Sequence, residues 1–225
     1  YNFHPTNTHK VLLSGAELQT VSFQTLNSNY SYFNVLEITN TSNAWIDFKP
    51  SLPALKLISN GGLIAKDFKV QELDWTLHEN MTVNGNLELL DKTLNLEGKT
   101  LVVMGDFIHT GGTLYLNGGT LIVKGDYRSQ TIVDDGAGNL TYSYGAGFLR
   151  MTNIADYMRV EGDFVMDSGV SNTGYLTAGI LELKGDFEQR ATRSVSSSDN
   201  YNFHPTNTHK VLLSGAELQT VSFQT

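Results

Sequence analysis

Four aspartates occupy the same place in four similar segments of the chain, and their spacing is the first candidate for chemistry. Asp106, Asp126, Asp163 and Asp186 each follow a glycine and precede Phe or Tyr. Aligned carboxylates and turn carbonyls can bind Ca²⁺, and two carboxylates facing each other across a groove can cleave glycosidic bonds. Acids that recur once per repeat form a row of like groups, whereas a catalytic site needs groups with different roles. We therefore expect these aspartates to cap turns, with calcium as the weaker alternative, and we expect no enzyme.

Two histidines near the start of the chain are the second candidate. His4 and His9 lie five residues apart, and the same pair recurs as His204 and His209. This spacing can hold a metal ion, but a protein zinc site takes three or four side-chain ligands, and no third ligand is evident. The chain contains no cysteine, which excludes disulfides and thiolate metal sites. We expect turn histidines and no cofactor.

Each of the four aspartates ends a short segment of alternating apolar and polar residues. The glycines before them are 20, 37 and 23 positions apart. Gly-Gly and Gly-Asp in the turns predict positive φ at glycine and side-chain capping of the bends. Alternation places every second side chain on one face of a strand, and the predicted inward set is Leu101, Val103, Leu121, Val123, Val160, Leu181 and Leu183. The segments are TLVVMGDF (Thr100–Phe107), TLIVKGDY (Thr120–Tyr127), DYMRVEGDF (Asp156–Phe164) and GILELKGDF (Gly179–Phe187).

A spacing of about twenty residues predicts an all-β fold, namely a parallel β-solenoid in which each rung lies on the rung before it. The aromatic residue after Gly-Asp would then stack into a ladder. MTVNGNLEL (Met81–Leu89) and GLIAKDFKV (Gly62–Val70) look like weaker copies of the same rung. A β-sandwich is the alternative, since it also has short strands at regular spacing, but sandwich strands have no reason to repeat one another in sequence.

The longest gap between these glycines indicates an insertion. TIVDD and LTYSY flank a glycine-rich GAGN, which predicts a hairpin at about 130–150. Exposed rings at Tyr142, Tyr144 and Phe148 would favour a binding role, and buried rings a structural one. Residues 191–200 are polar and predict a loop. The first third predicts further short strands that lack the Gly-Asp mark, at HKVLLSG, QTVSFQ, FNVLEITN, NAWIDFK and ALKLIS.

The first 25 residues recur without change as residues 201–225. The duplicate could be an engineered copy, a native staple between termini, or the beginning of the next unit in an array of near-identical units. We favour the array, with residues 1–200 as one unit and 201–225 as the start of the next. One unit is long enough to bury a core of its own. If the array is right, both copies should fold alike and be related by a fixed screw motion.

The composition limits the classes of partner that the protein can have. The formal net charge is −8, and an acidic array repels nucleic acid. No apolar stretch approaches the length needed to span a bilayer. We expect neither nucleic acid nor a membrane span, and we expect neighbouring identical units as partners.

Several segments together resemble a tandem-repeat module of large secreted or surface proteins from clostridia and related Gram-positive bacteria. They are GGTLYLNGGTLIVKGDYR, NTGYLTAGILELKGDFEQ, THKVLLSGAELQTVSF and FNVLEITN. The resemblance implies an extracellular, β-rich module in a very long chain and no enzyme class. The expected function is a structural unit of an extracellular fibre or cell-surface stalk. The alternatives are a multicopy adhesin or carbohydrate-binding module, with surface polysaccharide as ligand, and then a polysaccharide-active β-helix enzyme.

Overall fold

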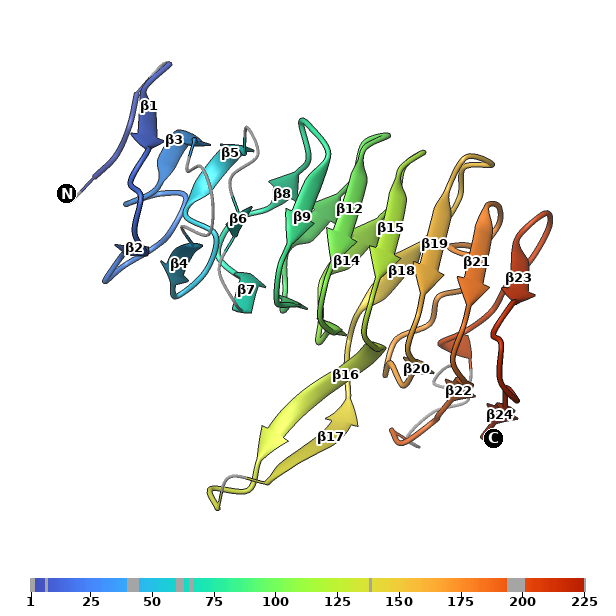
Figure 1. The fold of residues 1–225 in the computed structure, drawn as a ribbon. Coiled ribbons are helices and arrows are strands. Elements are labelled where there is room, and N and C mark those ends of the chain that lie inside the picture. Colours follow the sequence, from blue (N-terminus) through green and yellow to red (C-terminus); the bar gives the residue numbers. More distant parts are fainter. Residues whose placement is uncertain are drawn as a thin grey trace.

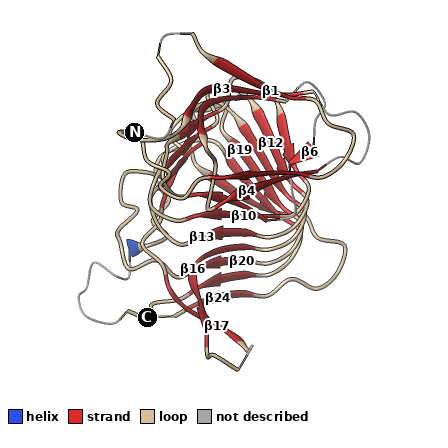
Figure 2. Ribbon diagram, turned by 90° about the vertical axis from the view of Figure 1, so that its left-hand side faces the viewer, coloured by secondary structure: helices blue, strands red, loops and turns tan. Residues whose placement is uncertain are grey.

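The computed structural model describes residues 3–6, 8–39, 45–59, 63–64, 67–137, 139–193 and 201–224. These residues form short strands that wind around one axis from the N-terminal to the C-terminal end (Figure 1). Viewed along that axis, successive strands lie on top of one another in flat walls (Figure 2). The predicted parallel β-solenoid is confirmed. None of the described residues forms a helix long and apolar enough to cross a membrane.

Three walls enclose the core, and from Leu63 onward the chain visits them in a fixed order. Wall 1 is a nine-stranded sheet. Its strands, in spatial order, are β2 (Gln19–Ser22), β4 (Trp45–Lys49), β6 (Leu63–Ile64), β9 (Met81–Val83), β12 (Thr100–Val103), β15 (Thr120–Val123), β19 (Tyr157–Val160), β21 (Ile180–Leu183) and β23 (Lys210–Leu213).

Wall 2 follows wall 1 around each corner. It contains β7 (Asp67–Val70), β10 (Asn86–Leu89), β13 (Phe107–His109), β16 (Tyr127–Asp134), β20 (Phe164–Met166), β22 (Phe187–Gln189) and β24 (Val221–Phe223). The corner residues between walls 1 and 2 include the Gly-Asp pairs, so the predicted repeat marks one corner of the solenoid.

Wall 3 closes each turn. It contains β8 (Trp75–Thr76), β11 (Thr93–Asn95), β14 (Thr113–Tyr115) and β18 (Phe148–Arg150). Bridges from Met151 to Leu176 and from Leu176 to Pro205 continue this wall beyond β18. In the other direction β8 contacts β5, so the three-stranded sheet of β1 (Lys10–Leu13), β3 (Phe33–Ile38) and β5 (Ala54–Ile58) extends wall 3 toward the N-terminus.

Equivalent residues stack in columns along the axis. Leu121 lies between Leu101 and Met158, and Val123 lies between Val103 and Val160. All seven residues predicted to face inward are fully buried. Named strands of the described residues pair in parallel, apart from β16 with the hairpin strand β17 (Leu140–Tyr144). Two facing antiparallel sheets are absent from this part of the chain, so the sandwich alternative is wrong.

The aromatic residues after Gly-Asp form the predicted ladder at the start of the wall 2 strands. Tyr127 and Phe164 stack with ring centroids 4.9 Å apart, and Phe164 and Phe187 stack at 5.6 Å. Phe107 lies 5.6 Å from Tyr127 with its ring tilted. All four side chains are buried, so the ladder fills the core beside wall 2.

The predicted hairpin insertion is present. β16 continues past wall 2 and pairs with β17 in an antiparallel register from Gln130 opposite Tyr144 to Asp134 opposite Leu140. The hairpin projects from the solenoid (Figure 1). The chain then rejoins wall 3 at β18. Residues 194–200 of the predicted loop at 191–200 lie outside the described residues, which resume at Tyr201.

The five strands predicted in the first third are also present as β1 to β5. They lack Gly-Asp because this part of the solenoid turns its corner differently. After β4 the chain bends at Pro50 and Ser51, and the Leu52 amide then donates to the Lys69 carbonyl of β7 at 2.9 Å, so this corner between walls 1 and 2 is made without Gly-Asp.

A buried histidine lies in the aromatic core. His109 of β13 is fully buried, and its Nδ1 shares a hydrogen bond of 2.8 Å with the Tyr127 hydroxyl. Burial lowers the pKa of His109 to about 4, because the charged imidazolium would lose its hydration. The same burial raises the pKa of Tyr127.

This histidine should make the fold sensitive to mild acid. A group whose pKa is lowered on folding binds protons better in the unfolded chain. Its contribution to stability is therefore complete above pH 6.5 and is lost as the pH falls from 6.5 to 4. We expect a loss of about 3 kcal/mol across this window, measured by urea unfolding at several pH values. His109→Gln should lack that part of the slope, while a substitution at the exposed His78 should keep it; equal slopes in all three proteins would contradict the assignment.

Candidate functional site

The four predicted aspartates form one continuous hydrogen-bonded ladder along the corner between walls 1 and 2. Asp106 Oδ1 accepts a hydrogen bond of 2.8 Å from the Asp126 amide, and Asp126 Oδ1 accepts one of 2.8 Å from the Asp163 amide. Asp163 Oδ1 in turn accepts from the Asp186 amide at 3.0 Å. Each carboxylate thus binds the backbone of the following rung. The predicted row is confirmed, but the capping bonds run between rungs and not within a turn.

Other residue types stand at the two ends of this ladder. Asn86 Oδ1 accepts from the Asp106 amide at 2.9 Å, so the weaker repeat at Met81–Leu89 belongs to the same row. At the other end Asp186 Oδ1 accepts from the Thr220 amide at 2.8 Å. The ladder therefore continues from the unit into the second copy of the duplicated segment.

The glycine before each aspartate is required by close approach. A Cβ on Gly125 would lie 2.1 Å from Asp106 Oδ1, and a Cβ on Gly162 would lie 2.3 Å from Asp126 Oδ1. The predicted positive φ is wrong at these glycines, whereas it is confirmed at Gly112 and Gly118 of the Gly-Gly turns. Each Gly-Asp pair thus connects successive rungs. The glycine leaves room for the carboxylate of the previous rung, and the aspartate carboxylate accepts a hydrogen bond from a backbone amide of the next rung.

A substitution at Asp126 should separate the acceptor role from the charge. Asp126→Ala leaves the Asp163 amide without its partner and should cost about 1–2 kcal/mol of unfolding free energy. Asp126→Asn keeps an Oδ1 acceptor, as Asn86 does in the native row, and should change stability by less than about 0.5 kcal/mol, although it weakens the 2.6 Å contact with Arg128. A comparable loss in both variants, measured by urea unfolding, would show that charge and not the acceptor matters.

Calcium was the weaker alternative for these aspartates. The described residues contain no group of three or more His, Asp or Glu side chains placed to share a metal ion. Because each Oδ1 already accepts an amide, we expect the melting temperature to be the same in millimolar CaCl₂ and in EDTA. A calcium-dependent rise of several degrees would restore the calcium alternative.

The histidines take different partners in the two copies. His4 lies edge-on to Tyr32, and His9 lies edge-on to Phe3. In the second copy, His204 lies against Tyr201, and His209 Nδ1 is 2.9 Å from the Ala178 carbonyl oxygen. All four thus contact an aromatic ring or a backbone carbonyl.

The hairpin aromatics do not form a row of three exposed rings. Tyr142 and Tyr144 are each 41% exposed, whereas Phe148 is half-buried and packs edge-on against Tyr175. The Arg128 guanidinium lies 4.9 Å from the Tyr142 ring centroid, which leaves one face of that ring covered.

A further set of specific contacts involves the second copy of the duplicated segment. The Ser214 hydroxyl donates to Glu182 at 2.6 Å, and Gln219 Nε2 donates to the Gly185 carbonyl at 2.6 Å. Hydrogen bonds from Ser214 and then Tyr157 lower the pKa of Glu182 to about 2. Asn202 is fully buried, accepts from Gln189 at 2.9 Å and donates to the Arg190 carbonyl at 2.6 Å.

Two of the residues involved have a different environment in the described part of the first copy. Ser14 and His9, the counterparts of Ser214 and His209, are exposed in the first copy. Sequence analysis missed this set because each polar residue looks like an ordinary loop residue. The only signal was that the identity of the two copies extends to such residues.

The comparisons with known proteins give no relative. No protein-family model matches the chain, and no curated protein or solved structure matches it.

Proposed function

We propose that the chain is a structural repeat unit of an extracellular fibre or cell-surface stalk, in which identical solenoid units follow one another along one axis. The observation that carries this proposal is the placement of the second copy. β23 continues wall 1 with Lys210 opposite Ile180, and β24 continues wall 2 with Val221 opposite Phe187. The beginning of a unit is therefore complementary to the end of a unit.

The physical basis is that each rung of a solenoid is stabilised by the rungs next to it. Each rung contacts only its neighbours, so adding a unit extends the hydrogen-bonded walls and buries the end of the core. It also covers strand edges that would otherwise pair with other chains. The aspartate ladder adds side-chain bonds along the same direction, and the acceptor role of its carboxylates supports a structural and not a catalytic function.

Electron microscopy tests this proposal. Chains of one, two and four units should appear as rods of constant width whose length grows by the same increment per unit. Discrete particles that become wider as units are added would refute the fibre. The control is a two-unit chain in which residues 201–225, at the start of the second unit, are replaced by a Gly/Ser linker of equal length. Its two units should appear as separate particles joined by a flexible linker.

A multicopy adhesin or carbohydrate-binding module is the second candidate, and the exposure of Tyr142 and Tyr144 favours it. Sugar rings stack on exposed aromatic faces, and many weak sites in one array would add avidity. Binding to immobilised polysaccharides that is lost in the double variant Tyr142→Ala/Tyr144→Ala would support it. Equal binding of parent and variant would remove the hairpin from consideration.

A further inference from the structure

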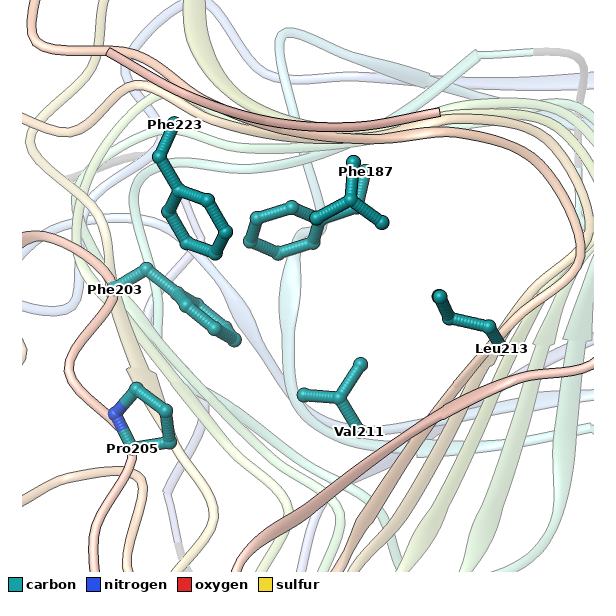
Figure 3. Close-up of a pocket in the computed structure, with 7 residues that line it drawn as sticks. Phe187, Phe203, Pro205, Val211, Leu213 and Phe223 are labelled. Atoms are coloured by element: carbon teal, nitrogen blue, oxygen red, sulfur yellow. The ribbon is translucent and has the colours of Figure 1, made fainter. Parts of the chain in front are cut away.

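The second copy of the duplicated segment borders an apolar hollow at the C-terminal end of the solenoid. Phe187, Phe203, Pro205, Val211, Leu213 and Phe223 point into a common space of about 310 Å³ (Figure 3). Phe223 is 62% exposed. This is the interior of the solenoid, left open on one side.

The first copy shows how the same side chains are covered. Val21 is 9% exposed in the first copy, whereas Val221 is 46% exposed in the second. Phe3 and Phe23 both lie edge-on to Phe33, with ring centroids 5.3 and 5.1 Å apart. In the second copy, by contrast, the corresponding Phe203 and Phe223 flank Phe187 at 4.9 and 5.2 Å.

We propose that the duplicated 25 residues are a two-sided joint, and that the hollow beside the second copy is filled by the segment Phe33–Ile38 of the next unit. This inference rests on the proposed array and specifies the contact between its units. Phe187 of one unit, the Phe203–Phe223 pair and Phe33 of the next unit then form one continuous aromatic cluster.

The hydrogen bonding of the two copies is complementary. In the first copy the carbonyls of His9 and Leu13 accept from Val35 and Thr39, so odd-numbered residues of β1 face β3. In the second copy the amides of Lys210 and Ser214 donate to Gly179 and Leu183, so even-numbered residues of β23 face β21. Successive residues of a strand point to opposite edges. One KVLL strand can therefore bind both neighbours at once.

The two copies of the duplicated segment lie on different walls of the solenoid. β1 lies on the extension of wall 3, whereas the identical β23 lies on wall 1. The turn between the two strands is the same in both copies, since the Gly15 amide donates to Gln19 Oε1 at 2.9 Å and the Gly215 amide donates to Gln219 Oε1 at 2.8 Å. The two copies thus differ by about one third of a turn in this three-walled coil.

The axial advance follows from the same strands. Wall 3 and its extension pass from β1 through β3, β5, β8, β11, β14 and β18 to Leu176 and Pro205. This gives about eight turns before β23, and at ~4.8 Å per turn the unit advances about 40 Å. A filament built by this joint should have that rise and a rotation of about one third of a turn per unit, apart from the twist of the solenoid itself.

Amide-resolved hydrogen exchange tests the joint. In the 225-residue chain the amides of Lys210, Leu212 and Ser214 should be protected, while Val211 and Leu213 exchange freely. The first copy is the internal control, because there Val11 and Leu13 should be protected and Lys10, Leu12 and Ser14 should not. In a chain extended after Thr225 by residues 26–200, exchange at Val211 and Leu213 should slow at least about hundredfold, so that all five amides are protected.

Two measurements on the extended chain keep the joint and the array distinguishable. If X-ray scattering shows a rod of twice the length but Val211 and Leu213 still exchange freely, the joint is wrong and the fibre stands. If the extended chain is not elongated, the proposed function is wrong, and the exchange at Val211 and Leu213 still decides whether Phe33–Ile38 covers the second copy.

Discussion

Leu121→Asp should unfold the middle of the solenoid. Leu121 is fully buried in a column between Leu101 and Met158. The change removes apolar contacts worth about 2–3 kcal/mol and places a carboxylate where no partner can reach it. We expect a loss of at least ~5 kcal/mol in urea unfolding, which is a large share of the stability of an ordinary domain.

The neighbouring residue provides a matched control. Ile122 has the same strand environment but is only partly buried, and it lies beside Val102 and Arg159 on the outer face. Ile122→Asp places the carboxylate next to a cation and in reach of water, so it should cost less than about 1 kcal/mol. If both variants unfolded at the same urea concentration, the inward direction of Leu121 would be wrong.

Gly125→Ala should destabilise the corner between walls 1 and 2 through a steric conflict between successive rungs. The new Cβ would lie 2.1 Å from Asp106 Oδ1 and 2.9 Å from the carbonyl carbon and oxygen of Gly105. The side chain can move, but the backbone of the previous rung cannot do so without opening wall 2. We expect a loss of about 3 kcal/mol in urea unfolding.

Gly136→Ala is the control for this substitution. Gly136 has a φ of +77° and no atom within 4 Å of its built Cβ, so it carries only the cost of an unfavourable backbone angle, about 1 kcal/mol. The difference between the two variants isolates the steric conflict between rungs. A smaller loss for Gly125→Ala than for Gly136→Ala would mean that the corner is not tightly packed.

The inward columns could be predicted from the sequence because they depend on local alternation alone. Leu101, Val103, Leu121 and Val123 face the core since every second residue of a strand does so, and the recurrence of Gly-Asp-aromatic fixes which strands lie in register. The hairpin was also predictable, because GAGN between two alternating segments leaves few other conformations.

The role of Gly-Asp could be predicted only in part. The sequence indicates that Asp106 and Asp126 are equivalent, but the space above Gly125 is set by the carboxylate of a residue twenty positions away. The turn-based prediction of positive φ is therefore confirmed at Gly112 and Gly118 of the Gly-Gly turns but is wrong at the glycines of the Gly-Asp pairs. His109 was not singled out, because nothing in its local sequence distinguishes a buried histidine from a turn histidine.

The placement of the two copies was beyond sequence reasoning. Residues 10–13 and 210–213 are identical, yet they belong to different walls. The neighbours decide this: β23 follows a full turn through Leu176 and Pro205, while β1 pairs with β3. The same KVLL strand therefore occurs at two different angular positions, which only the winding of the whole unit determines.

The rotation of about one third of a turn between successive units also sets the direction in which the hairpin of β16 and β17 projects. In an array built by the joint, successive units would point their hairpins in three directions around the axis. A flat surface lying along one side of such a fibre would meet only every third hairpin, at intervals of about 120 Å. The distance along the fibre between hairpins that point in the same direction would thus be three times the length of one unit. Neighbouring fibres could contact one another through their hairpins on all three sides.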